Sequence, residues 1–191
     1  MRKNLRYFLL PLSLLLSIML VNVLLPPITT EKQLTAIDDF HTTTLTGQKV
    51  TNEIFAGKFT LLVIWQTKDD NNRELLQNLA TLQTHEQSPL QIIGLVSNVS
   101  EDDEAAITAL GPKLSPISSI PQLLVNDDFA PLLATIKTTP TICFINSFGQ
   151  LIGQPLAAHD LNLIKKEARR LLATDSQADR NKSLFMKKAA Q

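Results

Sequence analysis

The sequence of 191 residues contains a single cysteine, Cys143. One cysteine excludes an intrachain disulfide and any metal site built from several thiolates. The chain also lacks a basic excess, because 18 lysine and arginine residues balance 18 aspartate and glutamate residues. Without that excess or a recognisable binding motif, nothing in the sequence indicates a nucleic-acid partner. Aromatic residues make up only 5% of the chain, so aliphatic side chains must form most of the hydrophobic core.

Residues 1–25 predict a transmembrane segment. Three of the first six residues are basic, and an apolar run follows from Tyr7 to Leu25. At ~1.5 Å per residue this run can cross a ~30 Å hydrocarbon core, and its basic flank should remain cytoplasmic. A cleaved signal peptide is the alternative, but the run ends without the small residues that a cleavage site requires. We therefore expect an uncleaved single-pass signal anchor in the cytoplasmic membrane, with the rest of the chain on the extracytoplasmic (periplasmic) side.

The rest of the chain divides into a stalk, a domain and a tail. Residues 26–37 are polar with two prolines and predict a short stalk. Residues 38–173 have the pattern of one folded domain. Residues 174–191 lack hydrophobic periodicity, which predicts a flexible C-terminal tail.

Hydrophobic periodicity within the domain predicts alternating strands and helices. Buried strands are expected at 59–65 and 90–97, with a helix that Asn71 caps between them. Such a β-α-β unit joins parallel strands. The other expected elements are a small hairpin at 42–51, an acidic helix at 100–110, a loop at 111–121, a short helix at 127–136, a β-hairpin turning at 147–150, and a helix at 160–172. This order predicts an α/β domain with a mixed central sheet flanked by helices.

The segment that begins at Trp65 reads W-Q-T-K-D-D-N-N-R. It resembles the W-x-[ST]-W-C-x-x-C-R segment of the TlpA/ResA-like thiol–disulfide oxidoreductases, which are membrane-tethered redoxins of the thioredoxin-like superfamily. Trp65, Thr67 and Arg73 match that pattern, and Lys68 replaces its second tryptophan.

Two further segments carry the same resemblance. Thr138-Thr139-Pro140-Thr141 is similar to the loop that contains the family's cis-proline, so the Thr139–Pro140 bond is expected to be cis. The segment from Phe40 to Phe59 is similar to the family's F-x-x-x-x-x-x-G…G-K entry. Together these segments imply a thioredoxin-like fold.

The chain departs from the family where the chemistry takes place, because Asp69 and Asn72 occupy the positions of the two cysteines. In the family, the helix N-terminus stabilises the thiolate of the first cysteine, which attacks a disulfide, and the second cysteine resolves the mixed disulfide. A carboxylate has no thiol redox couple, and an amide cannot resolve a mixed disulfide. The resemblance therefore implies the scaffold, while the residues exclude the usual dithiol chemistry.

Other residues do not restore that chemistry. Cys143 lies in the apolar segment TICFI, where burial should make its thiol inert. Asp69 and Asp70 could bind a hard cation, but capping of the helix and compensation of its dipole explain them better. His159 would need sulfur partners for copper, and the loop offers none. We expect no metal and no cofactor.

The resemblance leaves a partner-binding groove beside the proline, because domains of this kind pair extended peptides there. We expect the chain to be a redox-inactive protein that binds an exported protein or peptide. The alternative is a thiol–disulfide oxidoreductase or peroxidase-like enzyme in envelope redox chemistry or cytochrome maturation, acting through Cys143 or partner thiols. A structural subunit with a vestigial groove is a third possibility. The expected groove residues are Trp65, Thr67, Lys68, Asp69, Asn72, Arg73, Thr139 and Pro140.

Overall fold

The computed structural model of the chain describes residues 35–37, 39–68, 71–85, 90–114 and 119–189. The predicted anchor at 1–25 lies outside these residues, as do most of the predicted stalk and both Asp69 and Asp70. Among the residues that are described, no helix combines the length and the apolar character needed to cross a bilayer.

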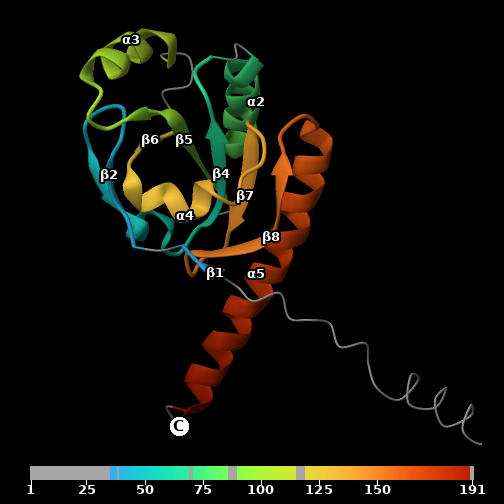
Figure 1. Cartoon of the computed structure of the whole chain (residues 1–191). Coiled ribbons are helices and arrows are strands. Elements are labelled where there is room, and N and C mark those ends of the chain that lie inside the picture. Colours follow the sequence, from blue (N-terminus) through green and yellow to red (C-terminus); the bar gives the residue numbers. More distant parts are fainter. Residues whose placement is uncertain (1–34, 38, 69–70, 86–89, 115–118, 190–191) are drawn as a thin grey trace, which may run out of the picture. The chain divides into compact units, whose positions relative to one another are not determined.

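The centre of the domain is a six-stranded mixed sheet in the order β1-β8-β7-β4-β5-β6 (Figure 1). Strands β4, β5 and β6 run parallel, whereas β7 pairs antiparallel with β4, β8 with β7, and β1 with β8. All seven residues of β4 are buried, as expected of a central strand with both faces covered. The strands are β1 (Thr35–Ala36), β4 (Phe59–Trp65), β5 (Leu90–Ser100), β6 (Gln122–Val125), β7 (Thr141–Ile145) and β8 (Gln150–Ala157).

Helices and a small hairpin cover the sheet. Side chains alternate between the faces of a strand, and those of β4 divide between two hydrophobic clusters accordingly. Residues of α2, α3 and α5 complete the first cluster, and residues of η1, η3 and α4 complete the second. These elements are β2 (His41–Thr43), β3 (Lys49–Thr51), η1 (Asn52–Phe55), α2 (Asn71–His85), α3 (Glu104–Leu114), η3 (Asp127–Phe129), α4 (Ala130–Leu133) and α5 (Leu161–Ala189).

Aromatic rings supply much of the second cluster despite the low aromatic content. The ring centroid of Phe40 lies 4.8 Å from that of Phe129 and 5.8 Å from that of Phe55, and all three side chains are fully buried.

We expect Phe129→Ala to lower the free energy of unfolding by about 3–5 kcal/mol, because it leaves a cavity in a closed core. Equilibrium urea unfolding would measure this loss. Phe148→Ala is the control, since its ring is 44% exposed, and equal losses in the two variants would contradict the packing described.

The sequence prediction was right for the main elements but wrong in the region after β5. Strand β5 extends to Ser100, so Ser100 does not cap the next helix. Asp103 caps it instead, with its Oδ1 atom accepting the Ala106 amide at 3.0 Å. Residues 111–114, expected in a loop, form the last turn of α3, and strand β6 was not predicted.

The expected stalk and tail also need correction. Thr35 and Ala36 form strand β1 rather than part of the stalk, because they pair with Leu151 and Gln150 of β8. Helix α5 does not end at Leu172 but continues to Ala189, so the expected lack of structure from 174 onward is wrong for 174–189. Asp175 explains part of this extension, since its carboxylate accepts hydrogen bonds from the amide and hydroxyl of Ser147 at 3.2 and 3.3 Å.

Candidate functional site

The sheet brings two of the sequence-predicted segments together at one end. Antiparallel pairing places Ile64 opposite Thr141, and parallel pairing places Trp65 opposite Val96. The end of β4 therefore meets the start of β7, where the Thr139–Pro140 peptide bond is cis as predicted. The loop that leaves β4 for α2 thus begins beside Pro140. Asp69 belongs to this loop but lies outside the described residues.

Trp65 does not offer its indole to a partner, because its side chain is only 3% exposed. The ring packs in the first hydrophobic cluster, and its Nε1–H donates to Oε1 of Gln122 at 3.0 Å. Gln122 is itself buried, and its Nε2 donates to the carbonyl of Ile120 at 3.1 Å. Gln122 was missed by sequence reasoning, since its strand was missed. Trp65 therefore supports the candidate site from inside the domain.

Gly94 of β5 leaves the space that Gln122 occupies. A Cβ atom at position 94 would lie 2.0 Å from the Oε1 atom of Gln122, far inside van der Waals contact. The two hydrogen bonds of Gln122 prevent that side chain from moving away without loss. We expect Gly94→Ala to lower the free energy of unfolding by about 1–3 kcal/mol, because an overpacked core must shift. Urea unfolding monitored by tryptophan fluorescence would measure the loss of stability. The emission spectrum of the folded variant would report the changed environment of the Trp65 indole.

Gly111 provides a matched control with a much smaller expected effect. It lies in α3 and is exposed, and a Cβ at this position would meet no atom within 4 Å apart from those of its own helix. Gly111→Ala should therefore change the free energy of unfolding by less than about 1 kcal/mol, because the helix-propensity gain of alanine over glycine is opposed by the contact of the new Cβ with the following Pro112. If Gly94→Ala cost no more stability than Gly111→Ala, the tight contact at Gly94 would be contradicted.

Asn72, which the resemblance aligned with a cysteine, is almost completely buried in the first turn of α2, with 1% of its surface exposed. Its Nδ2 donates to the carbonyl of Gln66 at 2.7 Å, which ties the loop to the helix. Its Oδ1 atom is buried without a hydrogen-bond partner. An amide at this position thus holds the loop but provides no nucleophile.

A second set of hydrogen bonds fixes the same loop to β5. The amide of Thr67 donates to Oδ1 of Asn98, and Nδ2 of Asn98 donates to Oγ1 of Thr67, both at 2.9 Å. The hydroxyl of Ser97 donates to the carbonyl of Trp65 at 3.0 Å. These contacts fix residues 65–68 at the start of the loop.

Only some of the expected groove residues are exposed to solvent. Lys68 and Arg73 are exposed, and Thr67 and Thr139 are half-buried. Pro140 is buried, as are Trp65 and Asn72. The accessible part of the site is therefore made by the loop after β4, the first turn of α2 and the residue before the proline.

Cys143 is buried in the middle of the sheet, as predicted, with 1% of its surface exposed. It pairs with Leu62 of β4 and belongs to the second hydrophobic cluster, whereas the residues of α2 belong to the first. Burial raises the pKa of the Cys143 thiol from 9.0 to about 12. Three residues of extended strand, roughly 10 Å, separate Cys143 from Pro140. The thiol is therefore both unactivated and remote from the accessible surface.

The described part of the chain contains no group of three or more His, Cys, Asp or Glu residues arranged to hold a metal ion. His159 is exposed in the turn before α5.

The sequence matches no protein-family model and no curated protein, but solved structures resemble the fold. The exposed lipoprotein thioredoxin Etrx1 from Streptococcus pneumoniae has a TM-score of 0.58 at 17% identity, over 69% of this chain and 98% of that chain. DsbF from MTB has a TM-score of 0.52 at 13% identity, over 70% and 94% of the two chains. The thioredoxin domain of a thiol-disulfide oxidoreductase from Bacteroides vulgatus has a TM-score of 0.51 at 20% identity, over 70% and 96%.

These likenesses establish the class of fold. The domain has a thioredoxin-like α/β fold, and its structural neighbours include thiol–disulfide oxidoreductases.

Proposed function

We propose that this chain is a membrane-anchored protein whose extracytoplasmic thioredoxin-like domain binds an exported protein or peptide without dithiol chemistry. The observation that carries this proposal is the lack of an activated sulfur at the candidate site. A buried amide stands at position 72, the sequence has a carboxylate at position 69, and the single thiol is enclosed in the sheet. A thiol–disulfide exchange reaction requires a thiolate that can reach its substrate.

The remaining geometry suits recognition of an extended peptide. Thr139 lies half-exposed before the cis peptide, next to the strand that follows, and a peptide backbone can pair with such a segment by strand addition. Lys68 of the facing loop and Arg73 of the first turn of α2 are exposed, so their side chains can contact the partner. The hydrogen bonds among Thr67, Asn98 and Asn72 hold that loop in place without any contribution from sulfur.

The predicted basic flank and apolar run at the N-terminus support the membrane part of the proposal. With residues 1–25 in the cytoplasmic membrane and the domain on its outer side, the partner would be a protein exported to the same compartment.

Site-specific photo-crosslinking in the native membrane tests partner binding. A photoreactive amino acid would replace Lys68 in the full chain, and a control chain would carry it at the exposed residue Thr108 of α3. We expect a discrete adduct from position 68, absent from position 108 and weakened by Thr139→Arg, which places a bulky charge in the groove. The same adducts from both positions would overturn the proposal, and no adduct from position 68 would favour a structural subunit with a vestigial groove.

One observation favours an alternative function, since the structural neighbours include thiol-disulfide oxidoreductases. On this alternative, the chain takes part in envelope redox chemistry or cytochrome maturation through Cys143 or through thiols of a partner. Consumption of hydrogen peroxide by the full chain, lost in Cys143→Ala, would support it.

A further inference from the structure

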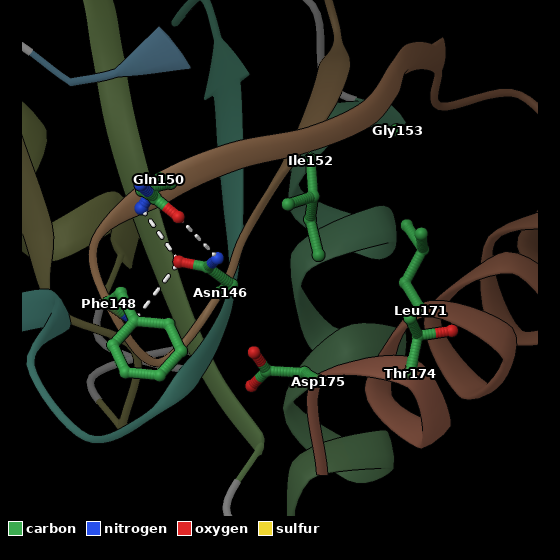
Figure 2. Close-up of a pocket in the computed structure, with 8 residues that line it drawn as sticks. All are labelled: Asn146, Phe148, Gln150, Ile152, Gly153, Leu171, Thr174 and Asp175. Carbon is green, nitrogen blue, oxygen red and sulfur yellow. Dashed lines mark hydrogen bonds between the residues drawn. The ribbon is translucent and has the colours of Figure 1, made fainter. Parts of the chain in front are cut away.

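A pocket of about 330 Å³ lies between the β7–β8 hairpin and helix α5 (Figure 2). Its volume is at the lower end of the ~300–1,000 Å³ range of small-molecule sites. Three apolar side chains line it, Phe148 from the hairpin turn, Ile152 from β8 and Leu171 from α5. The Phe148 ring is 44% exposed, whereas Leu171 is buried, so the pocket reaches from the surface into the core of the domain.

The pocket lies beside a β-bulge. The register of β8 against β7 shifts between Ile142 and Phe144, where residues 153–155 of β8 lie opposite a single residue of β7. Gly153 begins this bulge with a φ of 67°, and a Cβ there would lie 3.0 Å from Cδ1 of Leu171. Bulges are common beside active sites, where they redirect a strand. Here the bulge brings the backbone of β8 directly against an apolar side chain of α5.

Hydrogen bonds within the hairpin turn hold one wall of the pocket in place. Oδ1 of Asn146 accepts the amides of Phe148 and Gln150 at 3.0 and 2.8 Å, and its Nδ2 donates to Oε1 of Gln150 at 3.0 Å (Figure 2). The amide of Asn146 also donates to the carbonyl of Gln150 at 2.9 Å. A wall that is formed in advance reduces the ordering that a ligand must bring about.

The polar side chains deeper in the pocket already bond within the protein. The hydroxyl of Thr174 donates to the carbonyl of Arg170 at 3.2 Å. The carboxylate of Asp175 accepts hydrogen bonds from the amide and hydroxyl of Ser147 at 3.2 and 3.3 Å. Moving an ionised group of a ligand from water into a largely apolar space costs free energy unless a partner compensates it. The pocket therefore favours a ligand without a charge.

The pocket is separate from the candidate partner-binding site. Pro140 precedes β7 and Asn146 follows it, so the full length of the strand, roughly 20 Å, separates the two regions. An inference about the pocket therefore does not depend on partner binding beside the proline.

We propose that this pocket binds a small uncharged aromatic molecule of one or two rings. An apolar cavity of ~150 Å³ admits benzene, so a volume of about 330 Å³ has room for two fused rings. The ring of the ligand lies against Phe148, because aromatic rings attract one another in offset or edge-to-face geometry. Ile152 and Leu171 contact the rest of its apolar surface.

Calorimetric titration of the full chain with three indoles tests this proposal. Indole is uncharged, indole-5-carboxylate is negative, and 5-(aminomethyl)indole is positive. We expect saturable one-to-one binding of indole, at least about tenfold tighter than that of either charged analogue, because each analogue would carry its charge into the pocket.

Three substitutions locate the binding. Thr174→Trp places a large ring in the pocket and should weaken the binding of indole at least about tenfold, because that ring fills the volume of the ligand. Ala173→Trp adds the same ring at the preceding position of α5, which is exposed and does not line the pocket, and should change the affinity less than about twofold. Phe148→Ala should weaken binding about 2- to 12-fold, the ratio expected for the loss of one aromatic contact.

Circular dichroism melting would show which of these variants fold. If Thr174→Trp does not fold, Phe148→Ala still decides, since it removes a ring that is 44% exposed. No saturable binding of indole, equal or tighter binding of a charged analogue, or an unchanged affinity in folded Thr174→Trp or folded Phe148→Ala would overturn the proposal.

Discussion

Cys143 in the folded chain should react with a thiol reagent at least about 1,000-fold more slowly than an exposed cysteine does. Only the thiolate attacks such reagents, and burial raises the pKa of this thiol from 9.0 to about 12. At pH 8 about one molecule in 10⁴ would carry the thiolate, compared with about one in ten for a thiol of ordinary pKa. The closed packing around Leu62 and Phe129 should slow the reaction further, because the reagent must enter the core.

Maleimide labelling followed by intact mass spectrometry measures this difference. The control is a Lys68→Cys chain that also carries Cys143→Ala, because its thiol lies exposed on the candidate site. Unfolding in guanidinium chloride should make Cys143 react at the rate of the control. If folded Cys143 is labelled at a rate within tenfold of that of the Lys68→Cys control, its thiol is accessible. Cys143 could then act as the nucleophile that the enzymatic alternative requires.

Cysteines placed at positions 69 and 72 should form a reversible dithiol. We expect the double substitution Asp69→Cys with Asn72→Cys, made in a Cys143→Ala background, to form an intramolecular disulfide under mild oxidation. Asn72 already occupies a buried position in the first turn of α2, and a cysteine is smaller than the amide it replaces. The helix N-terminus should lower the pKa of a thiol placed before it, which makes exchange fast.

Intact mass spectrometry would detect the disulfide as the loss of two hydrogens, reversed by a thiol reductant. Thermal unfolding should show the oxidised form to be more stable than the reduced form by roughly 2 kcal/mol, the value for a very short closed loop. Asn72→Cys alone, with Asp69 retained, is the control and should show neither change. A double variant that folds but forms no intramolecular disulfide would mean that the loop from Trp65 to Arg73 is wrongly aligned with the family's motif.

The sequence predicts the centre of this fold well, because the signals there are strong. The apolar run at 59–65 corresponds to β4 residue for residue, since a strand buried on both faces has an unbroken apolar pattern. The cis peptide at Thr139–Pro140 was also predicted, from the resemblance to the family's proline loop. Asn71 was expected to cap helix α2, but the helix begins one residue earlier, at Asn71 itself.

The misses come from segments whose structure depends on contacts elsewhere in the chain. Strand β6 is only four residues long, and it forms because β5 provides its partner. Ser100 and Asp103 are both suitable capping residues, and pairing of β5 with Val125 extends the strand through Ser100. The extension of α5 to Ala189 is helped by the bond of Asp175 to the distant residue Ser147.

The sequence named two segments that the fold brings together at the end of β4. It did not show which of their side chains are buried. Which of them face solvent depends on packing: Trp65 ends the buried strand β4, and its indole N–H donates to Gln122 of the unpredicted strand. Sequence periodicity contains no information about such a partner.

Reduction of insulin disulfides by the full chain is the most direct test of a domain that binds without redox chemistry. The natural chain and Cys143→Ala should both show no turnover above the background set by the reductant alone, and the Asp69→Cys, Asn72→Cys variant should exceed that background. Turnover by the natural chain that disappears in Cys143→Ala would contradict the account, because it would assign catalysis to a thiol that this structure encloses in its core.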